Sequence, residues 1–219
     1  MGSITRSLAN NITTSGVISA SGITNDSVSA VTSFANASGG TLILLSTQTA
    51  SNSSSISFTS GLNGTYDEYI FKLINVRCIT DGAEFQFNMS TDGGSNYNVT
   101  KTSTWFQAYN DEATGSVYGI EYSIDHDLAQ STAFQDLTRD SGSDADQNLC
   151  GSLTIFNPSS TTYVKHYIAI INDYMNADYN RNSFTAGYGN TTSAINAVQF
   201  KMNSGNFDGT IKLYGVVKS

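Results

Sequence analysis

The sequence has few of the residues on which several protein classes depend. It contains two cysteines, one proline and only 13% charged residues among 219. Cys78 and Cys150 cannot make a disulfide framework and belong to no C-x-x-C pair, so we expect two buried thiols. No apolar run approaches the ~18 residues of a membrane span, and the first residues lack the apolar stretch of a signal peptide. We expect a protein that is made in the cytoplasm and does not insert into a membrane.

Positive charge is also scarce. The chain has 18 acidic and 10 basic residues, which gives a formal net charge of −8. Such a chain repels the phosphate backbone of a nucleic acid, so we expect no nucleic-acid partner.

Histidine, the usual catalytic base, occurs only twice. His166 lies within an apolar run, where we expect a core or interface residue, and His126 stands between two aspartates in an expected solvated loop. Neither a G-x-S-x-G motif nor a Cys-His signature is present. Nothing selects a pair of carboxylates for glycoside hydrolysis among the 18 acids. We therefore expect no catalytic residue and no enzyme activity.

Short acidic motifs raise the alternative of calcium binding. Asp140, Asp144 and Asp146 fall in the segment DSGSDAD, and Asp125 and Asp127 form a second pair. The EF-hand pattern is absent, and the chain lacks the clustered Cys and His residues of a zinc site. The prediction is a solvated acidic loop, with no metal and no cofactor.

Small polar residues dominate what is present. Ser (31), Thr (25) and Asn (21) are abundant, while 39% hydrophobic and 11% aromatic residues suffice to form a core. From residue 41 onward, strand-length apolar runs alternate with turn residues, which indicates an all-β domain. The expected strands are Thr41–Ser46, Ile56–Thr59, Tyr69–Val76, Glu84–Ser90, Tyr97–Phe106, Val117–Ile124, Leu149–Phe156, Tyr163–Ile171, Ala194–Met202 and Thr210–Val217.

The pattern predicts an antiparallel β-sandwich, jelly-roll-like, over residues 41–219. Within it, Tyr163–Ile171 carries apolar residues on both faces, so we expect a central strand buried on both sides.

Residues 1–40 differ from the rest, because they contain no aromatic residue before Phe34 and only sparse larger apolar residues. Such a segment cannot form its own core, so it is either a disordered leader or an extended arm that docks on another subunit. The regular recurrence of apolar residues favours a docking or oligomerisation arm. Its candidate anchors are Ile4, Leu8, Ile12, Val17 and Ile18.

The stretch from Thr102 to Val164 holds half of the acids and only one basic residue, Arg139. Long polar loops on a rigid sheet often carry recognition. Nearby aromatic rings suit either sugar stacking or packing on a sheet face, and both readings stay open. The candidate surface-recognition residues are Trp105, Tyr109, Tyr118, Tyr122, Asp140, Asp144 and Asp146.

Several segments resemble known sequences. They are SITRSLANNITTSGV near the start, Ser90–Thr100, Asp127–Gln135, Phe156–Tyr167 and Thr185–Gly215. Together they resemble virion proteins of marine bacteriophages, notably the tail-fibre-like proteins of short-tailed phages that infect cyanobacteria. The resemblance covers nearly the whole chain and includes no catalytic motif.

This resemblance implies a virion component, most simply a homotrimeric fibre. Its N-terminal arm would attach it to other capsid or tail proteins, and its β-domain would adhere to a glycan or protein on the host surface. The alternative is a capsid decoration, cement or tail adaptor protein with a purely structural role. A polysaccharide-degrading tailspike is disfavoured, because 219 residues lack the length for a repeated β-helix body.

Overall fold

The computed structural model describes residues 41–113 and 115–218, and every regular element in them is a β-strand. The strands are β1 (Leu42–Ser53), β2 (Ser55–Phe58), β3 (Glu68–Cys78), β4 (Phe85–Ser90), β5 (Lys101–Asp111), β6 (Tyr118–Tyr122), β7 (Gln135–Asp136), β8 (Leu149–Phe156), β9 (Lys165–Tyr174), β10 (Tyr179–Gly189), β11 (Ala197–Met202) and β12 (Phe207–Val216). The expectation of an all-β fold is confirmed.

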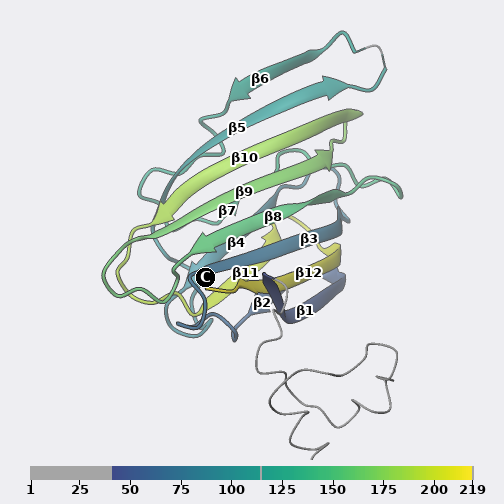
Figure 1. Ribbon diagram of the computed structural model, residues 1–219. Helices are drawn as coiled ribbons and strands as arrows, with labels where there is room; N and C mark the ends of the chain where they lie inside the picture. Colours follow the sequence, from purple (N-terminus) through teal and green to yellow (C-terminus); the bar gives the residue numbers. More distant parts are fainter. Residues whose placement is uncertain (1–40, 114, 219) are drawn as a thin grey trace, which may run out of the picture. The chain divides into compact units, whose positions relative to one another are not determined.

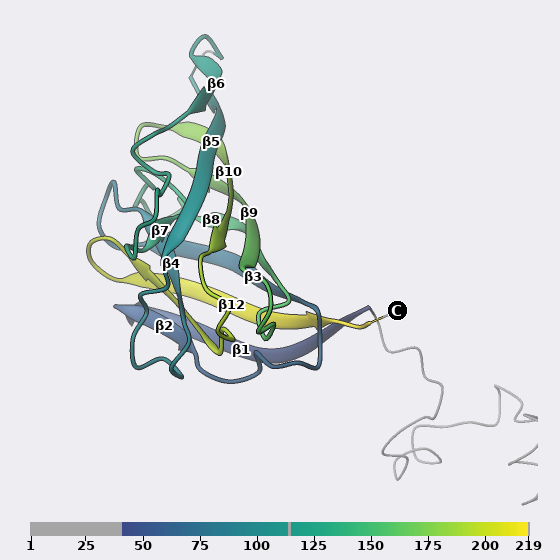
Figure 2. The same cartoon turned by 90° about the vertical axis from the view of Figure 1, so that its left-hand side faces the viewer.

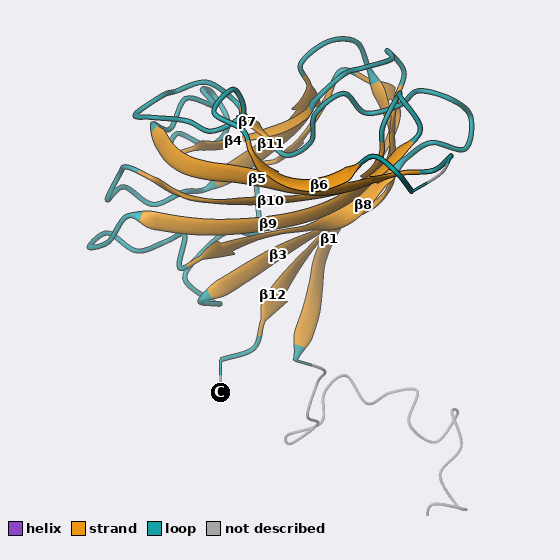
Figure 3. Cartoon of the chain, turned by 90° about the horizontal axis from the view of Figure 1, so that it is seen from above, coloured by secondary structure: helices purple, strands orange, loops and turns teal. Residues whose placement is uncertain are grey.

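The strands form two antiparallel sheets that pack face to face (Figure 1). The large sheet has the order β1-β12-β3-β8-β9-β10-β5-β6, and the small sheet has the order β2-β11-β4-β7. Viewed from above, the strands of the large sheet turn progressively from one edge to the other, as the twist of β-strands requires (Figure 3).

The predicted jelly roll is embedded in this arrangement. Without β5, β6, β9 and β10, the remaining eight strands have the chain order 1-8-3-6 in one sheet and 2-7-4-5 in the other. That interleaving is the two-sheet pattern of a jelly roll. The four extra strands widen only the large sheet, and their β6 edge rises beyond the part that the small sheet covers (Figure 2).

The core lies between the small sheet and the jelly-roll half of the large sheet. In β4, the alternation of Phe85, Phe87 and Met89 with polar residues directs the apolar side chains inward. The ring of Phe200 on β11 lies at the centre of the core. Its centroid is 5.2 Å from that of Phe71 in the opposite sheet and 5.8 Å from that of Phe85. Burial of each such ring stabilises the fold by about 1.5–3 kcal/mol relative to an exposed position.

Beyond the small sheet, a long connection covers the inner face of the extra strands. Residues 123–148 cross this face, and the inner side chains there are mainly polar. The His126 ring packs on Trp105, with centroids 4.9 Å apart, and the Tyr167 hydroxyl donates to Gln135 Oε1 at 3.1 Å. Polar packing of this kind lets the large sheet extend without a second sheet below it.

The outer face of the large sheet is not covered by any described segment. Tyr167, Ala169 and Ile171 of β9 are buried, whereas Ile168 and Ile170 are each nearly half exposed. The expectation that this strand is buried on both faces is wrong, and His166 is not a core residue, because it is exposed on the outer face. The reason is that the sandwich supplies only one partner layer.

Two strands were not predicted. β10 pairs with β9 and β5 in the middle of the extension, although its sequence YNRNSFTAGYG is mostly polar and glycine-rich. β7 has only two residues.

The arm candidates Ile4, Leu8, Ile12, Val17 and Ile18 lie outside the described residues.

Candidate functional site

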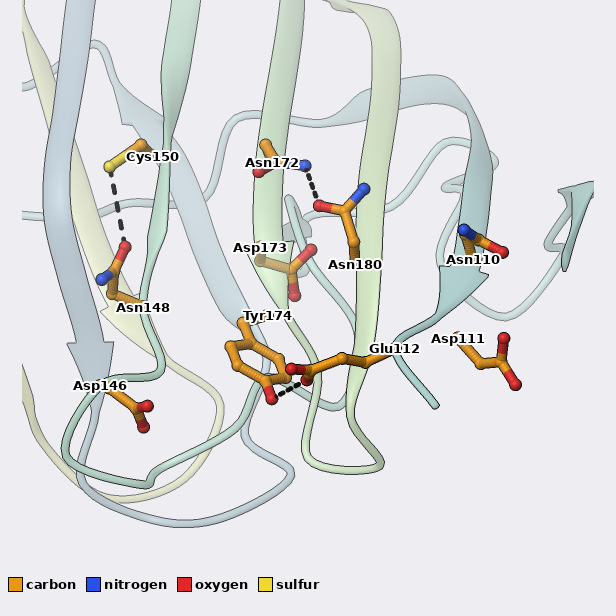
Figure 4. Close-up of a pocket in the computed structure, with 10 residues that line it drawn as sticks. All are labelled: Asn110, Asp111, Glu112, Asp146, Asn148, Cys150, Asn172, Asp173, Tyr174 and Asn180. Carbon is orange, nitrogen blue, oxygen red and sulfur yellow. Dashed lines mark hydrogen bonds between the residues drawn. The ribbon is translucent and has the colours of Figure 1, made fainter. Parts of the chain in front are cut away.

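A pocket of about 520 Å³ lies at one end of β5, β8, β9 and β10, on the outer face of the large sheet (Figure 4). The register places Tyr174, Asn180 and Asn110 in one cross-strand row, and Cys150 faces Asn172 in the next row. Residues directly opposite in an antiparallel pair project from the same face, so these side chains meet at the floor. Three separate parts of the sequence, residues 110–112, 146–150 and 172–180, therefore build one surface.

Amide groups dominate the pocket lining. The four asparagines are Asn110, Asn148, Asn172 and Asn180. Asn172 Nδ2 donates to Asn180 Oδ1 and to the Arg181 carbonyl, both at 2.8 Å. These bonds fix the Asn172 amide and leave the Nδ2 group of Asn180 as a donor.

The rim of the pocket is acidic. Asp111, Glu112 and Asp146 contribute carboxylates, and no lysine or arginine occurs among the described lining residues. The Tyr174 hydroxyl donates to the Glu112 carboxylate and lies 3.4 Å from Asp178 Oδ1. The hydrogen bond to Glu112 raises the pKa of Tyr174 well above its usual value. The hydroxyl therefore stays protonated and holds Glu112 over the floor.

An ion pair supports the floor from below. Arg181 Nε donates to Asp173 Oδ1 at 3.0 Å, and neither side chain is exposed. Burial raises the pKa of Asp173, while the Arg181 guanidinium acts in the opposite direction. The pair fixes the ends of β9 and β10, which carry the pocket residues Asn172 and Asn180.

Two of the predicted recognition residues meet at this pocket. Asp146 lines it, and Tyr118 on β6 stands directly opposite Asn110, with 71% of its surface exposed. Tyr118 therefore extends the row of pocket side chains by one strand.

Other predicted recognition residues lie elsewhere. Tyr122 is on the outer face further along β6, where its hydroxyl donates to Asp127 at 2.6 Å. Tyr109 faces inward and lines a separate hollow of about 180 Å³. Asp140 pairs with Arg139 at 3.1 Å, and Asp144 is an exposed loop residue.

Trp105 is not a surface residue. It lies in the middle of β5 on the inner face, has no exposed surface, and packs on His126. The expected strand ended at Phe106, whereas β5 continues to Asp111, so the segment from Trp105 to Tyr122 consists largely of β5 and β6. The alternation within β5 turns Trp105 inward and its neighbour Phe106 outward.

Sequence reasoning missed the asparagines on the pocket floor. On the outer face of β9, Ile168 and Ile170 are followed by Asn172, so a polar residue breaks an apolar series at the strand end. That change marks where the exposed face passes from apolar to amide chemistry. The cross-strand partners of Asn172 could not be read from the sequence.

A second polar group lies on the other side of the domain, next to the small sheet. Glu84, His126 and Asp136 each present one ligand atom, and these atoms lie within 4.8 Å of one another. His126 Nδ1 is 3.2 Å from Asp136 Oδ2 and 3.8 Å from Glu84 Oε1. The expectation of a solvated His126 is wrong, since only 7% of the residue is exposed.

Cys150 also differs from expectation. Cys78 is buried, as predicted, and burial raises the pKa of its thiol to about 11. Cys150 is exposed on β8 at the pocket, where its Sγ accepts a hydrogen bond from the Asn75 backbone N–H at 3.3 Å. The prediction of two buried thiols is therefore wrong for Cys150, because its side chain projects from the uncovered outer face.

Next to the pocket, the outer face becomes apolar. Ile170, Phe184, Phe106 and Tyr122 form one row across four strands. The rings of Phe106 and Phe184 stack, with centroids 4.7 Å apart and an interplanar angle of 7°. Ile120, on the neighbouring row of β6, is 81% exposed. A contiguous exposed apolar surface of this kind is typical of an interaction site.

No protein-family model matches the chain, and no match was found among curated proteins or solved structures. None of the described residues belongs to a helix that is long and apolar enough to cross a membrane. The function of the pocket is therefore inferred from the side chains that line it.

Proposed function

We propose that the protein is a non-enzymatic virion component of a short-tailed bacteriophage, a fibre that binds a host-surface glycan through the outer-face pocket. It would be made in the host cytoplasm and act on the particle. The observation that carries the adhesive role is the pocket of about 520 Å³, lined by four asparagines and several carboxylates beside the exposed ring of Tyr118. The virion assignment comes from the resemblance of several sequence segments to virion proteins of marine bacteriophages.

The chemistry of the pocket suits a sugar. Each glycan hydroxyl donates one hydrogen bond and accepts others. Asparagine amides supply both donors and acceptors for these bonds, and carboxylates supply further acceptors. The volume falls within the range of roughly 300–1,000 Å³ found for small-molecule sites. Tyr118, next to Asn110, offers an exposed aromatic face for the apolar side of a sugar ring.

Charge restricts the ligand further. Asp111, Glu112 and Asp146 line the pocket without a basic residue among the described lining residues, and the whole chain carries −8. A sulfated or uronic-acid glycan would be repelled by these carboxylates. The proposed ligand is therefore a neutral glycan.

Binding of the full-length protein to host cells and to immobilised neutral glycans tests the adhesive role. We expect Asn180→Ala and Tyr118→Ala each to weaken binding at least tenfold. Thr104→Ala, an exposed position on the same sheet face outside the pocket, is the matched control and should bind normally. Equal binding by all variants, or preferential binding of anionic glycans, would contradict the proposal. Release of reducing sugar from the bound glycan would contradict the non-enzymatic part.

Attachment is assigned to residues 1–40. A triple variant Ile4→Ser, Leu8→Ser and Ile12→Ser removes the first apolar anchors of the arm without altering the described domain. We expect this variant to bind glycan normally and to be lost from purified virions. Incorporation at the normal level would refute a docking role for the arm.

The apolar row on the outer face is assigned to contacts between copies in a homotrimer. The row carries no charge, so copies can approach there despite the net charge of −8. We expect Phe106→Ser with Ile170→Thr to convert the trimer to a monomer in sedimentation analysis. Thr49→Ala, on the distant strand β1, should leave the trimer intact. A trimer unaffected by the double variant would exclude this face as its interface.

A structural decoration or adaptor protein is the second candidate, and the same apolar row favours it. A protein of that type would bury this row against a neighbouring capsid or tail subunit. A wild-type protein that is monomeric in solution, binds no host glycan and loses its place on the particle when Phe106 and Ile170 are replaced would support this role over the fibre.

A further inference from the structure

Glu84, His126 and Asp136 come together from three separate segments. Glu84 directly precedes β4, Asp136 lies on β7, and His126 belongs to the connection between β6 and β7. β4 and β7 pair in antiparallel register, with Gln86 opposite Asp136. Glu84 and Gln86 are two residues apart and so project from the same face of the chain as it enters β4.

The histidine is held in place independently of the two acids. Its backbone carbonyl accepts a hydrogen bond from Gln135 Nε2 at 2.8 Å, and its ring lies against Trp105. Only 8% of the His126 side chain is exposed, so the ring has little freedom to turn away. Its Nδ1 atom therefore faces both carboxylates in a fixed position.

We propose that Glu84, His126 and Asp136 form a binding site for one divalent transition-metal ion of the Zn²⁺ type. The proposal is independent of glycan binding. Zinc lies about 2.0–2.2 Å from nitrogen and oxygen ligands, so neighbouring ligand atoms around a tetrahedral ion are roughly 3.4 Å apart. The distances from Nδ1 to the Asp136 and Glu84 oxygens, 3.2 and 3.8 Å, lie on either side of that value.

The outer shell of hydrogen bonds supports this assignment. Gln86 Nε2 donates to Asp136 Oδ1 at 2.6 Å, and Asn203 Nδ2 donates to Glu84 Oε2 at 2.9 Å. Each amide binds one oxygen of a carboxylate and leaves the other oxygen directed toward His126. Metal-binding carboxylates are commonly oriented by such hydrogen bonds.

The charge balance also favours a cation. The ion pairs that Glu84 and Asp136 form in the described part of the chain are both with His126, and the two side chains are 22% and 14% exposed. Two carboxylates in a largely dehydrated place repel each other, and one imidazole, which carries at most a single positive charge, cannot compensate both. A divalent ion bound to neutral imidazole compensates both.

The donor set selects the type of metal. Calcium takes six to eight oxygen ligands and magnesium prefers an oxygen octahedron, so a site with an imidazole nitrogen suits neither well. Three protein ligands from His and carboxylate, with water in the fourth position, match zinc. Bound there, the ion would tie the β6–β7 connection to β4, and so anchor the extended part of the large sheet to the small sheet.

The experiment begins with full-length protein treated with a chelator and then titrated with Zn²⁺ by calorimetry. We expect one ion per chain with a dissociation constant below 10 μM, as an order-of-magnitude bound for a site of three protein ligands. Co²⁺ in place of Zn²⁺ should give the visible absorption bands of a four-coordinate nitrogen and oxygen site. A chelated protein that binds neither ion stoichiometrically would overturn the proposal and leave His126 beside two acids with no bound ion.

Variants locate the ion on these residues. Glu84→Gln and Asp136→Asn keep the side-chain shape, and each should weaken Zn²⁺ binding at least tenfold. Gln86→Ala, which removes an orienting hydrogen bond, should weaken it by roughly 10–100-fold. Asp144→Asn and Asp146→Asn alter exposed loop acids and should bind Zn²⁺ as the wild type does. Wild-type affinity in Glu84→Gln and Asp136→Asn, with circular dichroism showing intact strands, would place the ion elsewhere and refute this site.

Discussion

Arg181 of β10 stands directly opposite Asp173 of β9, and the two fully buried side chains form a bidentate ion pair. Ser141 Oγ adds a hydrogen bond to Asp173 Oδ2 at 3.2 Å and so joins the long connection to the sheet. The pair lies beneath the pocket floor. It therefore links the stability of the extended sheet to the position of Asn172 and Asn180.

Loss of one partner of this pair should be costly. Arg181→Ala leaves an uncompensated carboxylate in the interior, so we expect the free energy of unfolding to fall by about 3–5 kcal/mol. Arg139→Ala breaks the partly exposed pair with Asp140 and should cost no more than about 1 kcal/mol. Urea denaturation of both variants measures the difference. Equal losses would mean that the buried pair adds nothing specific.

Lys101 predicts a pH dependence of stability. Its side chain is fully buried, and burial lowers its pKa from 10.5 to about 7. Below pH 7 the Lys101 amine is charged in both the folded and the unfolded chain, so it does not make the free energy of unfolding depend on pH. Between 7 and 10.5 the unfolded chain binds the proton that the folded chain has released, so the free energy of unfolding rises with pH, by at most about 1.4 kcal/mol per unit.

We therefore expect the urea midpoint to increase between pH 7 and 8.5, and Lys101→Met to remove most of that increase. Burial lowers the pKa of Lys165 in the same direction, so part of the slope should persist in the variant. Lys72→Met, at an exposed position on β3, should keep the full slope. A wild-type protein whose stability falls over this range would contradict the assigned protonation of Lys101.

The two thiols should differ in reactivity. Cys150 is exposed, whereas Cys78 is buried and has a raised pKa. In the native protein, a chromogenic disulfide reagent at pH 8 should modify one thiol quickly and the other only after unfolding, because the thiolate is the reactive form. Cys150→Ser should abolish the fast phase. Two fast thiols in the native protein would mean that Cys78 is not in the core.

Gly209 should be far less replaceable than another glycine of positive φ. Its φ is +135°, at the register shift between β12 and β3, and a Cβ there would lie 2.7 Å from Val76 Cα. Gly93, with φ +74°, has open space around it. We expect Gly209→Ala to lower the free energy of unfolding by about 3 kcal/mol and Gly93→Ala by about 1 kcal/mol. Thermal or urea unfolding should reveal this order, and its reversal would contradict the bulge geometry.

The strands with regular alternation could be predicted, and those without it could not. β4 combines buried Phe85, Phe87 and Met89 with polar neighbours, so its period of two is visible in the sequence. β10 has buried Arg181, Ser183 and Thr185 on its inner face, so no apolar period marks it as a strand. Its position is secured by pairing with β9 and β5, which is a long-range property.

The pocket was predictable only in outline. The acidic stretch includes Asp146 and Tyr118, which lie at or beside the pocket. The floor, however, combines Asn110 with Asn172 and Asn180, which are more than sixty positions further along the chain. Only the strand order brings Asn110 and Asn180 into one row, with Asn172 in the row beside it.

The sequence by itself determined the β-rich class, most strand positions and the two-sheet architecture, because apolar alternation and turn residues act locally. The tertiary structure decided which faces are covered. Ile168 and Ile170 looked like core residues but are exposed, and His126 looked solvated but is buried beside Glu84 and Asp136. The physical reason is that burial depends on what packs against a side chain, and long-range strand pairing places that partner.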